Sequence, residues 1–160
     1  MKTLIIKTVL VIFSIGIINN AKANGAKVPA PVASAYATAY PLAKLKDWKI
    51  AKAGYKAEFK LNHKTYTVVY TPDGSLVRTE IQLKATKELP VAVKNALRNG
   101  KYASFYIDAM KQVKTANDAK YVMTIDNHNG TTMASEGYGS WEDYQVVYVG
   151  NGKLLNVTEL

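Results

Sequence analysis

Few side chains in this sequence could carry catalysis. His63 and His128 are the only imidazoles, and neither lies in a metal-binding spacing such as His-x-x-x-His. Cysteine is absent, which excludes thiolate nucleophiles and thiolate metal sites. No serine lies in a Gly-x-Ser-x-Gly elbow, and solvation at a loop end accounts for the adjacent carboxylates of Glu142 and Asp143. We therefore predict no catalytic residue, no cofactor and no enzymatic activity, and we expect a binding protein.

A polar segment offers the alternative function, binding of a small ligand or a calcium ion in the cell envelope. Residues 126–130, Asp-Asn-His-Asn-Gly, carry closely spaced oxygen atoms, but they lack the ligand spacing and the closing Glu of an EF-hand. The glycines at 137, 139, 150 and 152 form neither a Gly-x-Gly-x-x-Gly motif nor a Walker loop. No metal site is assigned.

The long connection at residues 127–142 is polar and glycine-rich, yet it contains Tyr138 and Trp141. Long loops in compact domains are often either functional or disordered, and aromatic side chains are enriched at protein interfaces. We predict Tyr138 and Trp141 as partner-contact residues. A tolerated insertion without a binding role is the alternative interpretation.

The elements that must position these residues occur twice. Residues 68–81 (VVYTPDGSLVRTEI) match residues 146–160 (VVYVGNGKLLNVTEL), each with an Asp-Gly or Asn-Gly pair between two apolar runs. This arrangement is typical of a β-hairpin. Residues 28–36 and 89–97 also match, in the spacing of apolar residues around a proline. The sequence therefore predicts two tandem helix-plus-sheet repeats, at about 28–83 and 89–160.

Hydrophobic periodicity predicts the order of elements in each repeat. Prolines 29 and 31 open the first helix, Tyr40-Pro41 ends it, and Gly100 ends the second helix. Apolar and charged residues alternate through 55–61, so 48–61 is expected to be one strand, with a possible kink at Gly54. The expected helices span about 32–39 and 90–99, and the expected strands span 48–61, 65–71, 75–83, 102–113, 121–126, 144–149 and 153–160.

Eleven tyrosines make up much of the aromatic content. Alternation along a strand places Tyr66 and Tyr70 on one face of the first repeat, and Tyr144 and Tyr148 on one face of the second. These rings either cover the helices from beneath or face outward with basic residues at their rim. For the second case we predict a partner-binding surface made of Tyr66, Tyr70, Tyr144, Tyr148 and Arg78.

The N-terminus resembles a secretory signal peptide. A basic start, an apolar stretch from Leu4 to Ile18 and Ala21-Lys22-Ala23 predict cleavage after Ala23. The apolar run after Lys7 is too short for a stable membrane span. We expect a single mature domain, residues 24–160, in the periplasm or outside the cell. Cleavage removes three lysines from the net charge of +9 and leaves 18 basic against 12 acidic residues, or +6. This modest excess, without a recognised motif, predicts no nucleic-acid binding.

The order of the short motifs resembles the PepSY-like family of exported Bacteroidetes-type proteins, similar in fold to beta-lactamase inhibitory protein. The resemblance covers nearly all of residues 28–160, and it implies an α+β fold with helices packed on one face of an antiparallel sheet. It implies no catalytic residue, and it associates the wider group with the restraint of peptidases. The motifs are Val28-Pro29, Tyr40-Pro41, Trp48, Tyr55-x-Ala57-x-Phe59, Val68-x-Tyr70-x-x-Asp73-Gly74 and Thr79-Glu80, followed by Leu89-Pro90 and a second round.

Together these observations predict a secreted or periplasmic, non-enzymatic binding module. The specific expectation is inhibition or regulation of an extracytoplasmic enzyme, such as a peptidase or a beta-lactamase. The expected partner is an exported enzyme or another envelope protein.

Overall fold

The computed structural model describes residues 26–127 and 142–160, so the predicted signal segment, His128, Tyr138 and Trp141 lie outside the described residues. Each strand pairs antiparallel with the next strand along the chain, and the sheet is a meander in the order β1 to β8. The helices are α1 (Ala30–Ala39), α2 (Val91–Asn99) and the short 3-10 helix η1 (Thr86–Glu88). The strands are β1 (Lys44–Ala51), β2 (Gly54–Leu61), β3 (Lys64–Tyr70), β4 (Leu76–Leu83), β5 (Tyr106–Lys114), β6 (Ala119–Asp126), β7 (Asp143–Val149) and β8 (Leu154–Glu159).

The segment expected to be one strand through Gly54 is a hairpin, so that prediction was wrong. β1 and β2 are antiparallel neighbours, with Trp48 opposite Ala57. The chain reverses at residues 52 and 53, where no Asn-Gly or Asp-Gly pair marks the turn. A two-residue loop places Ala51 opposite Gly54, so the inward side chains change from even positions in β1 to odd positions in β2. Trp48 is the only buried residue of β1, so the sequence shows this change of phase too weakly to reveal the turn.

The predicted turns after β3 and β7 are confirmed, and each brings its hairpin against a helix. Gly74 and Gly152 have φ angles of +89° and +87°, a region that favours glycine. A Cβ atom on Gly74 would lie 2.8 Å from the carbonyl oxygen of Pro31, and one on Gly152 would lie 2.6 Å from that of Ala92. Pro31 and Ala92 are each the second residue of their helix. Both hairpins therefore meet a helix N-terminus in the same way.

Each helix buries two residues one turn apart, and each has its own core cluster. Val32 and Tyr36 of α1 pack on the strands of the first half, and Val93 and Leu97 of α2 pack on those of the second. A fully buried valine contributes about 1.5–3 kcal/mol to stability relative to an exposed one. The first cluster also contains Trp48, Ala57, Phe59, Val68 and Tyr70, and the second also contains Leu89, Tyr102, Met110, Tyr121, Met123, Ile125, Val146 and Tyr148.

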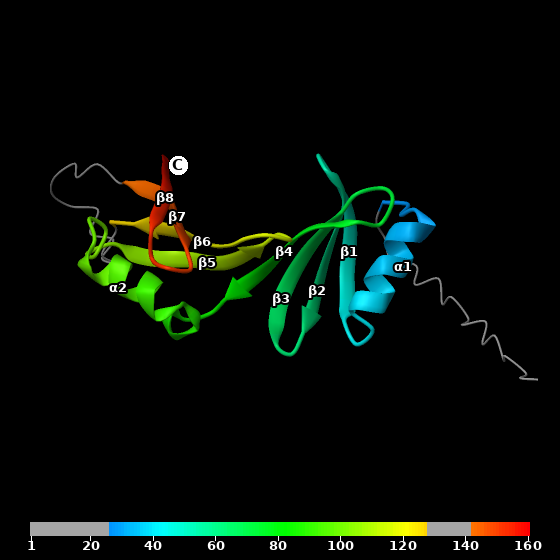
Figure 1. Ribbon diagram of the computed structural model, residues 1–160, viewed down its shortest axis with the longest axis horizontal. Coiled ribbons are helices and arrows are strands. Elements are labelled where there is room, and N and C mark those ends of the chain that lie inside the picture. The colour runs from blue at the N-terminus through cyan, green and yellow to red at the C-terminus, as the bar shows by residue number, and fades with distance from the viewer. Residues whose placement is uncertain (1–25, 128–141) are drawn as a thin grey trace, which may run out of the picture.

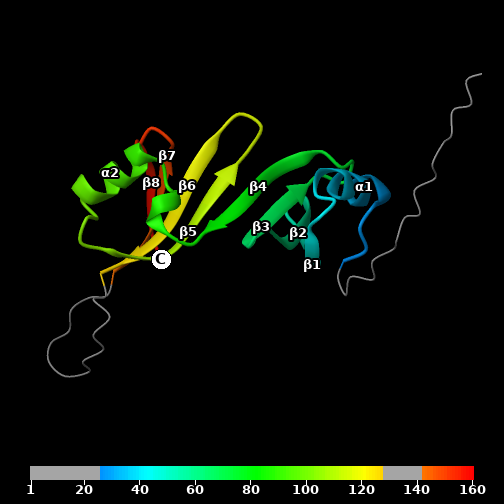
Figure 2. The same ribbon diagram turned by 90° about the horizontal axis from the view of Figure 1, so that it is seen from below.

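Strand register places both clusters on the same face of the sheet. Residues opposite each other on neighbouring strands point to the same side. One such row begins in the first cluster and ends in the second: Phe59, Tyr66, Ile81, Gln112, Tyr121 and Tyr148. The molecule is elongated, with α1 and α2 at opposite ends and the β4–β5 pair across the middle (Figures 1 and 2). Because both helices occupy one face, the other face has no helix over it in the described residues.

Candidate functional site

The predicted tyrosine surface is the covered face of the sheet. Tyr70 is 2% exposed and Tyr148 is 3% exposed, so neither can contact a partner. Their predicted contact role is corrected to a core role, because the buried residues of the helices pack against this side of the strands. Tyr66 and Tyr144 are half-buried at the margins of the same clusters. Tyr66 stacks on Phe59 with ring centroids 5.3 Å apart, and Tyr144 packs against Tyr102 at 5.5 Å.

Arg78, the fifth predicted contact residue on the sheet, lies on the opposite face. It stands in register with Val69, one position away from Val68 of the core, and strand alternation turns it away from the helices. Its Nε donates a hydrogen bond to Oε1 of Glu80 at 2.8 Å. The structure thus separates Arg78 from the tyrosines with which the sequence grouped it.

The uncovered side of the sheet is the candidate site, and we call it the open face. Basic side chains outnumber acidic ones along it, and valines occupy much of its second half. Its charged and valine members, identified by the register, are Lys44, Asp47, Lys49, Lys56, Glu58, Lys60, Val69, Arg78, Glu80, Lys111, Val113, Lys120, Val122, Asp126, Asp143, Val147 and Val149. Val69 is buried, and the other four valines are half-buried. The valines match the apolar centre of a protein interface, and the surrounding charges match its polar rim.

An ion-pair network fixes the middle of the open face. Glu80 on β4 accepts hydrogen bonds from Arg78 and from Nζ of Lys111 on β5, the second at 2.9 Å. The Glu80 side chain is 14% exposed. Burial raises the pKa of Glu80, but the hydrogen bonds from Arg78 and Lys111 outweigh it and hold the pKa below the ordinary value. The carboxylate stays charged and keeps two cations in place beside the valines.

Sequence reasoning missed the valines of the open face, although a signal was present. On β6 and β7, Val122 and Val147 occupy alternate positions to the core residues Met123 and Val146. A strand with one wet face should place polar residues at those positions. Apolar residues at these positions indicate that the second face of the sheet is also partly apolar, and exposed apolar patches mark interaction sites.

The structure supports no binding role for two other residues considered in the sequence, His63 and Asp126. His63 is a turn residue with φ of +61°, following Asn62 at +48°, as in a type I′ hairpin turn. Asp126, the first residue of the calcium alternative, is 5% exposed, and residues 128–130 of that segment lie outside the described residues. Within residues 26–127 and 142–160, no three His, Cys, Asp or Glu side chains form a group that could hold a metal ion.

In the described part of the chain, the fold defines an α+β protein with an antiparallel eight-stranded sheet and two α-helices on one face. It is similar to a DUF2874 family protein from Bacteroides ovatus, with 26% identity and a TM-score of 0.72 over 84% of this chain and 89% of that one. A protein from Bacteroides eggerthii, described as periplasmic, has 22% identity and a TM-score of 0.71 over 84% and 90% of the two chains. A BLIP-like protein from Bacteroides fragilis has 19% identity and a TM-score of 0.68 over 84% and 88%.

The fold is thus that of these Bacteroides proteins, including the BLIP-like one. No protein-family model and no curated protein matches the chain. None of the helices in the described residues is long and apolar enough to cross a membrane.

Proposed function

We propose that this chain is an exported, non-enzymatic binding module that inhibits or regulates an extracytoplasmic enzyme. Its fold is similar to that of a BLIP-like protein and of a protein described as periplasmic. Residues 1–23 have the sequence pattern of a cleavable signal peptide, which supports the same location. A peptidase or a beta-lactamase is the class of partner expected for a PepSY-like or beta-lactamase-inhibitor-like protein.

The open face is the observation that carries this proposal. In the described residues both helices pack on the opposite side, which leaves charged and aliphatic side chains available across several neighbouring strands. Its basic excess suits a partner with an acidic surface, because complementary charge accelerates and orients protein association. Tyr138 and Trp141, outside the described residues, remain predicted contacts from the loop that joins β6 to β7.

We also propose that the two halves are copies of one unit. The first strand of each half carries a register irregularity at the same place, between Leu45 and Asp47 in β1 and between Ile107 and Ala109 in β5. The last hairpin of each half has a second irregularity, after Val69 in β3 and after Val147 in β7. Matching bulges support a common origin, because bulges are specific features of related strands.

The test begins with the exported chain, purified from the periplasm of an expression host and used to capture proteins from a Bacteroides periplasmic extract. We expect the protein to retain a hydrolase, and we expect the catalytic rate of that hydrolase to fall as more of the protein is added. A double variant, Lys120→Glu with Val122→Glu, should weaken this binding about tenfold or more, because it places acidic groups on the open face. The matched control is Ser34→Glu on the exposed side of α1, which should bind as the wild type does.

A second double variant, Tyr138→Ala with Trp141→Ala, tests the predicted loop contacts. The proposal is contradicted if no hydrolase is inhibited, or if the open-face and loop variants both bind the inhibited enzyme as tightly as the wild type. Circular dichroism of each variant separates loss of contact from loss of folding.

A further inference from the structure

A cavity of about 130 Å³ lies beneath α2, on the helix side of the sheet and away from the open face. It is bounded by Thr86 of η1, by the last turns of α2, by the turn that follows, and by β5 and β6. A cavity of roughly 150 Å³ in another protein accommodates benzene. The space beneath α2 is therefore of a size for one compact apolar group. Its apolar lining consists of Leu97, Tyr102, Phe105, Ile107 and Ile125.

Comparison with the other half of the molecule explains why this space is empty of side chains. Ile125 stands beside the β5 bulge as Phe59 stands beside the β1 bulge, and Leu97 occupies the position in α2 that Tyr36 occupies in α1. The rings of Tyr36 and Phe59 pack edge-to-face with centroids 5.3 Å apart. Two aliphatic side chains replace two aromatic rings in the second half, and the smaller volume leaves a cavity.

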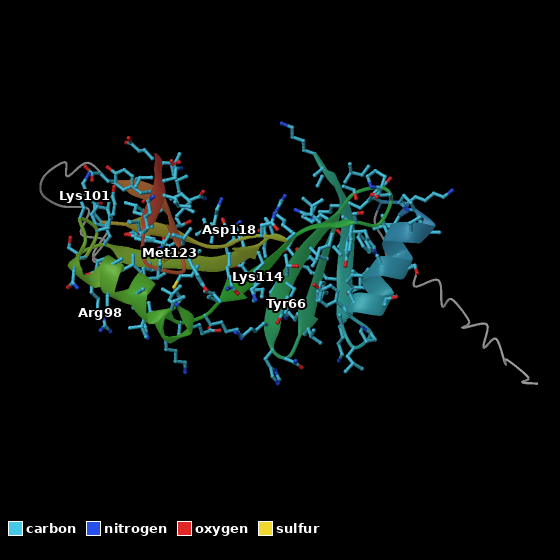
Figure 3. The ribbon with its side chains drawn as sticks, in the orientation of Figure 1. Tyr66, Arg98, Lys101, Lys114, Asp118 and Met123 are labelled. Atoms are coloured by element: carbon cyan, nitrogen blue, oxygen red, sulfur yellow. The ribbon has the colours of Figure 1, made fainter. Side chains whose placement is uncertain are left out.

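Two cationic side chains of α2 line the cavity. Lys94 and Arg98 both line it, one helical turn apart, and Lys94 is half-buried. Arg98 is exposed and extends from the end of α2 (Figure 3). Among the described residues that line the cavity none is acidic, and neither cation forms an ion pair with another described residue. A site with an apolar interior and uncompensated cations complements an apolar group that carries a negative charge.

We propose that this cavity binds a carboxylate attached to a compact apolar group, such as a phenyl ring or a branched alkyl chain. The apolar group lies between the aromatic lining and Ile125, and the carboxylate accepts hydrogen bonds from Lys94 and Arg98. Such charge-assisted hydrogen bonds are the strong ones among protein contacts. A free small acid and the C-terminal residue of a peptide share this chemistry.

The test is a titration of the exported chain, followed by the methyl resonances of Leu97 and Ile125 in NMR spectra. The probes are phenylacetate, isovalerate, a tetrapeptide that ends in a free phenylalanine carboxylate, and the uncharged phenylacetamide. We expect saturable shifts with at least one carboxylate and at least tenfold weaker binding of phenylacetamide. If the tetrapeptide binds more tightly than phenylacetate, the natural ligand is the C-terminus of a peptide. If only the free acids bind, the natural ligand is a small metabolite.

Two sets of variants locate the site. Lys94→Gln with Arg98→Gln should weaken binding about tenfold, whereas Lys84→Gln with Lys87→Gln removes the same charge from exposed residues nearby and should leave it unchanged. Ile125→Phe, which installs the ring found at Phe59, should fill the cavity and abolish binding. The proposal is overturned if no carboxylate gives a saturable shift, if the acid and the amide bind equally, or if the Lys94 and Arg98 double variant binds normally. The glutamine variants change exposed or half-buried side chains, so they should fold normally. They therefore test the site even if Ile125→Phe does not fold.

Discussion

Glu80 and Lys111 join the two halves of the molecule through a hydrogen bond of 2.9 Å between Oε2 and Nζ. The bond crosses from β4 to β5, the strand pair at the middle of the elongated sheet (Figure 2). The strands of this pair come from different halves, and each half has its own core cluster. The second cluster reaches β4 through Leu83, which lies opposite Met110, and the Glu80–Lys111 contact supplements the backbone ladder at the same junction on the other face.

Glu80→Gln should lower the free energy of unfolding at pH 7 by about 1–2 kcal/mol, because it removes a charged acceptor from two cations. The pKa of Glu80 is depressed in the folded state, so its stabilisation is present above the ordinary glutamate value and is lost as the pH falls through the folded value. The difference between wild type and variant should therefore shrink in acid. Urea unfolding at pH 7 and in acid measures this change.

Glu58→Gln is the matched control for Glu80→Gln. Glu58 accepts a hydrogen bond from Lys46 at 2.8 Å, but the Lys46 side chain is 68% exposed. Exposed ion pairs contribute little, so the Glu58 variant should change stability by less than about 0.5 kcal/mol. Equal effects of the two substitutions would show that burial of Glu80 does not strengthen its contacts.

Glu88 should titrate far below an ordinary glutamate. Hydrogen bonds from Nζ of Lys64, at 2.5 Å, and from the backbone N–H of Lys84, at 2.8 Å, lower the pKa of Glu88 to about 2. Its contribution to stability is thus complete above the ordinary glutamate value and disappears as the pH falls through about 2. NMR titration of the carboxyl carbon tests this value. Lys64→Gln should raise the pKa, and a normal value in the wild type would contradict the contact.

Gly152→Ala should destabilise the protein by more than about 2 kcal/mol, since the new Cβ would lie 2.6 Å from the carbonyl oxygen of Ala92 at a strained φ. Gly150→Ala, two residues away, is the control. A Cβ at Gly150 would meet only Cε2 of Tyr121, at 3.9 Å, so stability should change little. Thermal unfolding of both variants compares them. Similar melting temperatures would show that the hairpin does not press on α2.

Tyr70→Phe should leave stability unchanged or raise it by up to about 1 kcal/mol. The hydroxyl of Tyr70 is buried and has no hydrogen-bond partner in the described residues, and burial, with Tyr40 and Tyr36 nearby, raises its pKa to about 12. Tyr121→Phe is the control, because the Tyr121 hydroxyl accepts a hydrogen bond from Nε2 of Gln112 at 2.9 Å. That variant should lose about 1 kcal/mol. A comparable loss at Tyr70 would reveal a hydrogen bond to its hydroxyl.

Local sequence patterns were sufficient for most of the elements. The turns after β3 and β7 follow from Asp73-Gly74 and Asn151-Gly152, because few residue pairs adopt the backbone angles of these turns. The helix end at Gly100 was also predictable. The hairpin between β1 and β2 was not, because its turn at residues 52 and 53 lacks such a pair and β1 has a single buried residue, Trp48, to mark the change of phase.

The sequence by itself determined that Tyr66, Tyr70, Tyr144 and Tyr148 share one side of their strands, since alternation is a property of a single strand. Only the tertiary structure decided that the helices cover this side, which buries Tyr70 and Tyr148 and leaves Arg78 and the valines on the open face. The cavity beneath α2 likewise depends on the volumes of side chains from α2, β5 and β6. Periodicity fixes which residues point the same way, but which of two faces is buried depends on packing between segments that are distant in the chain.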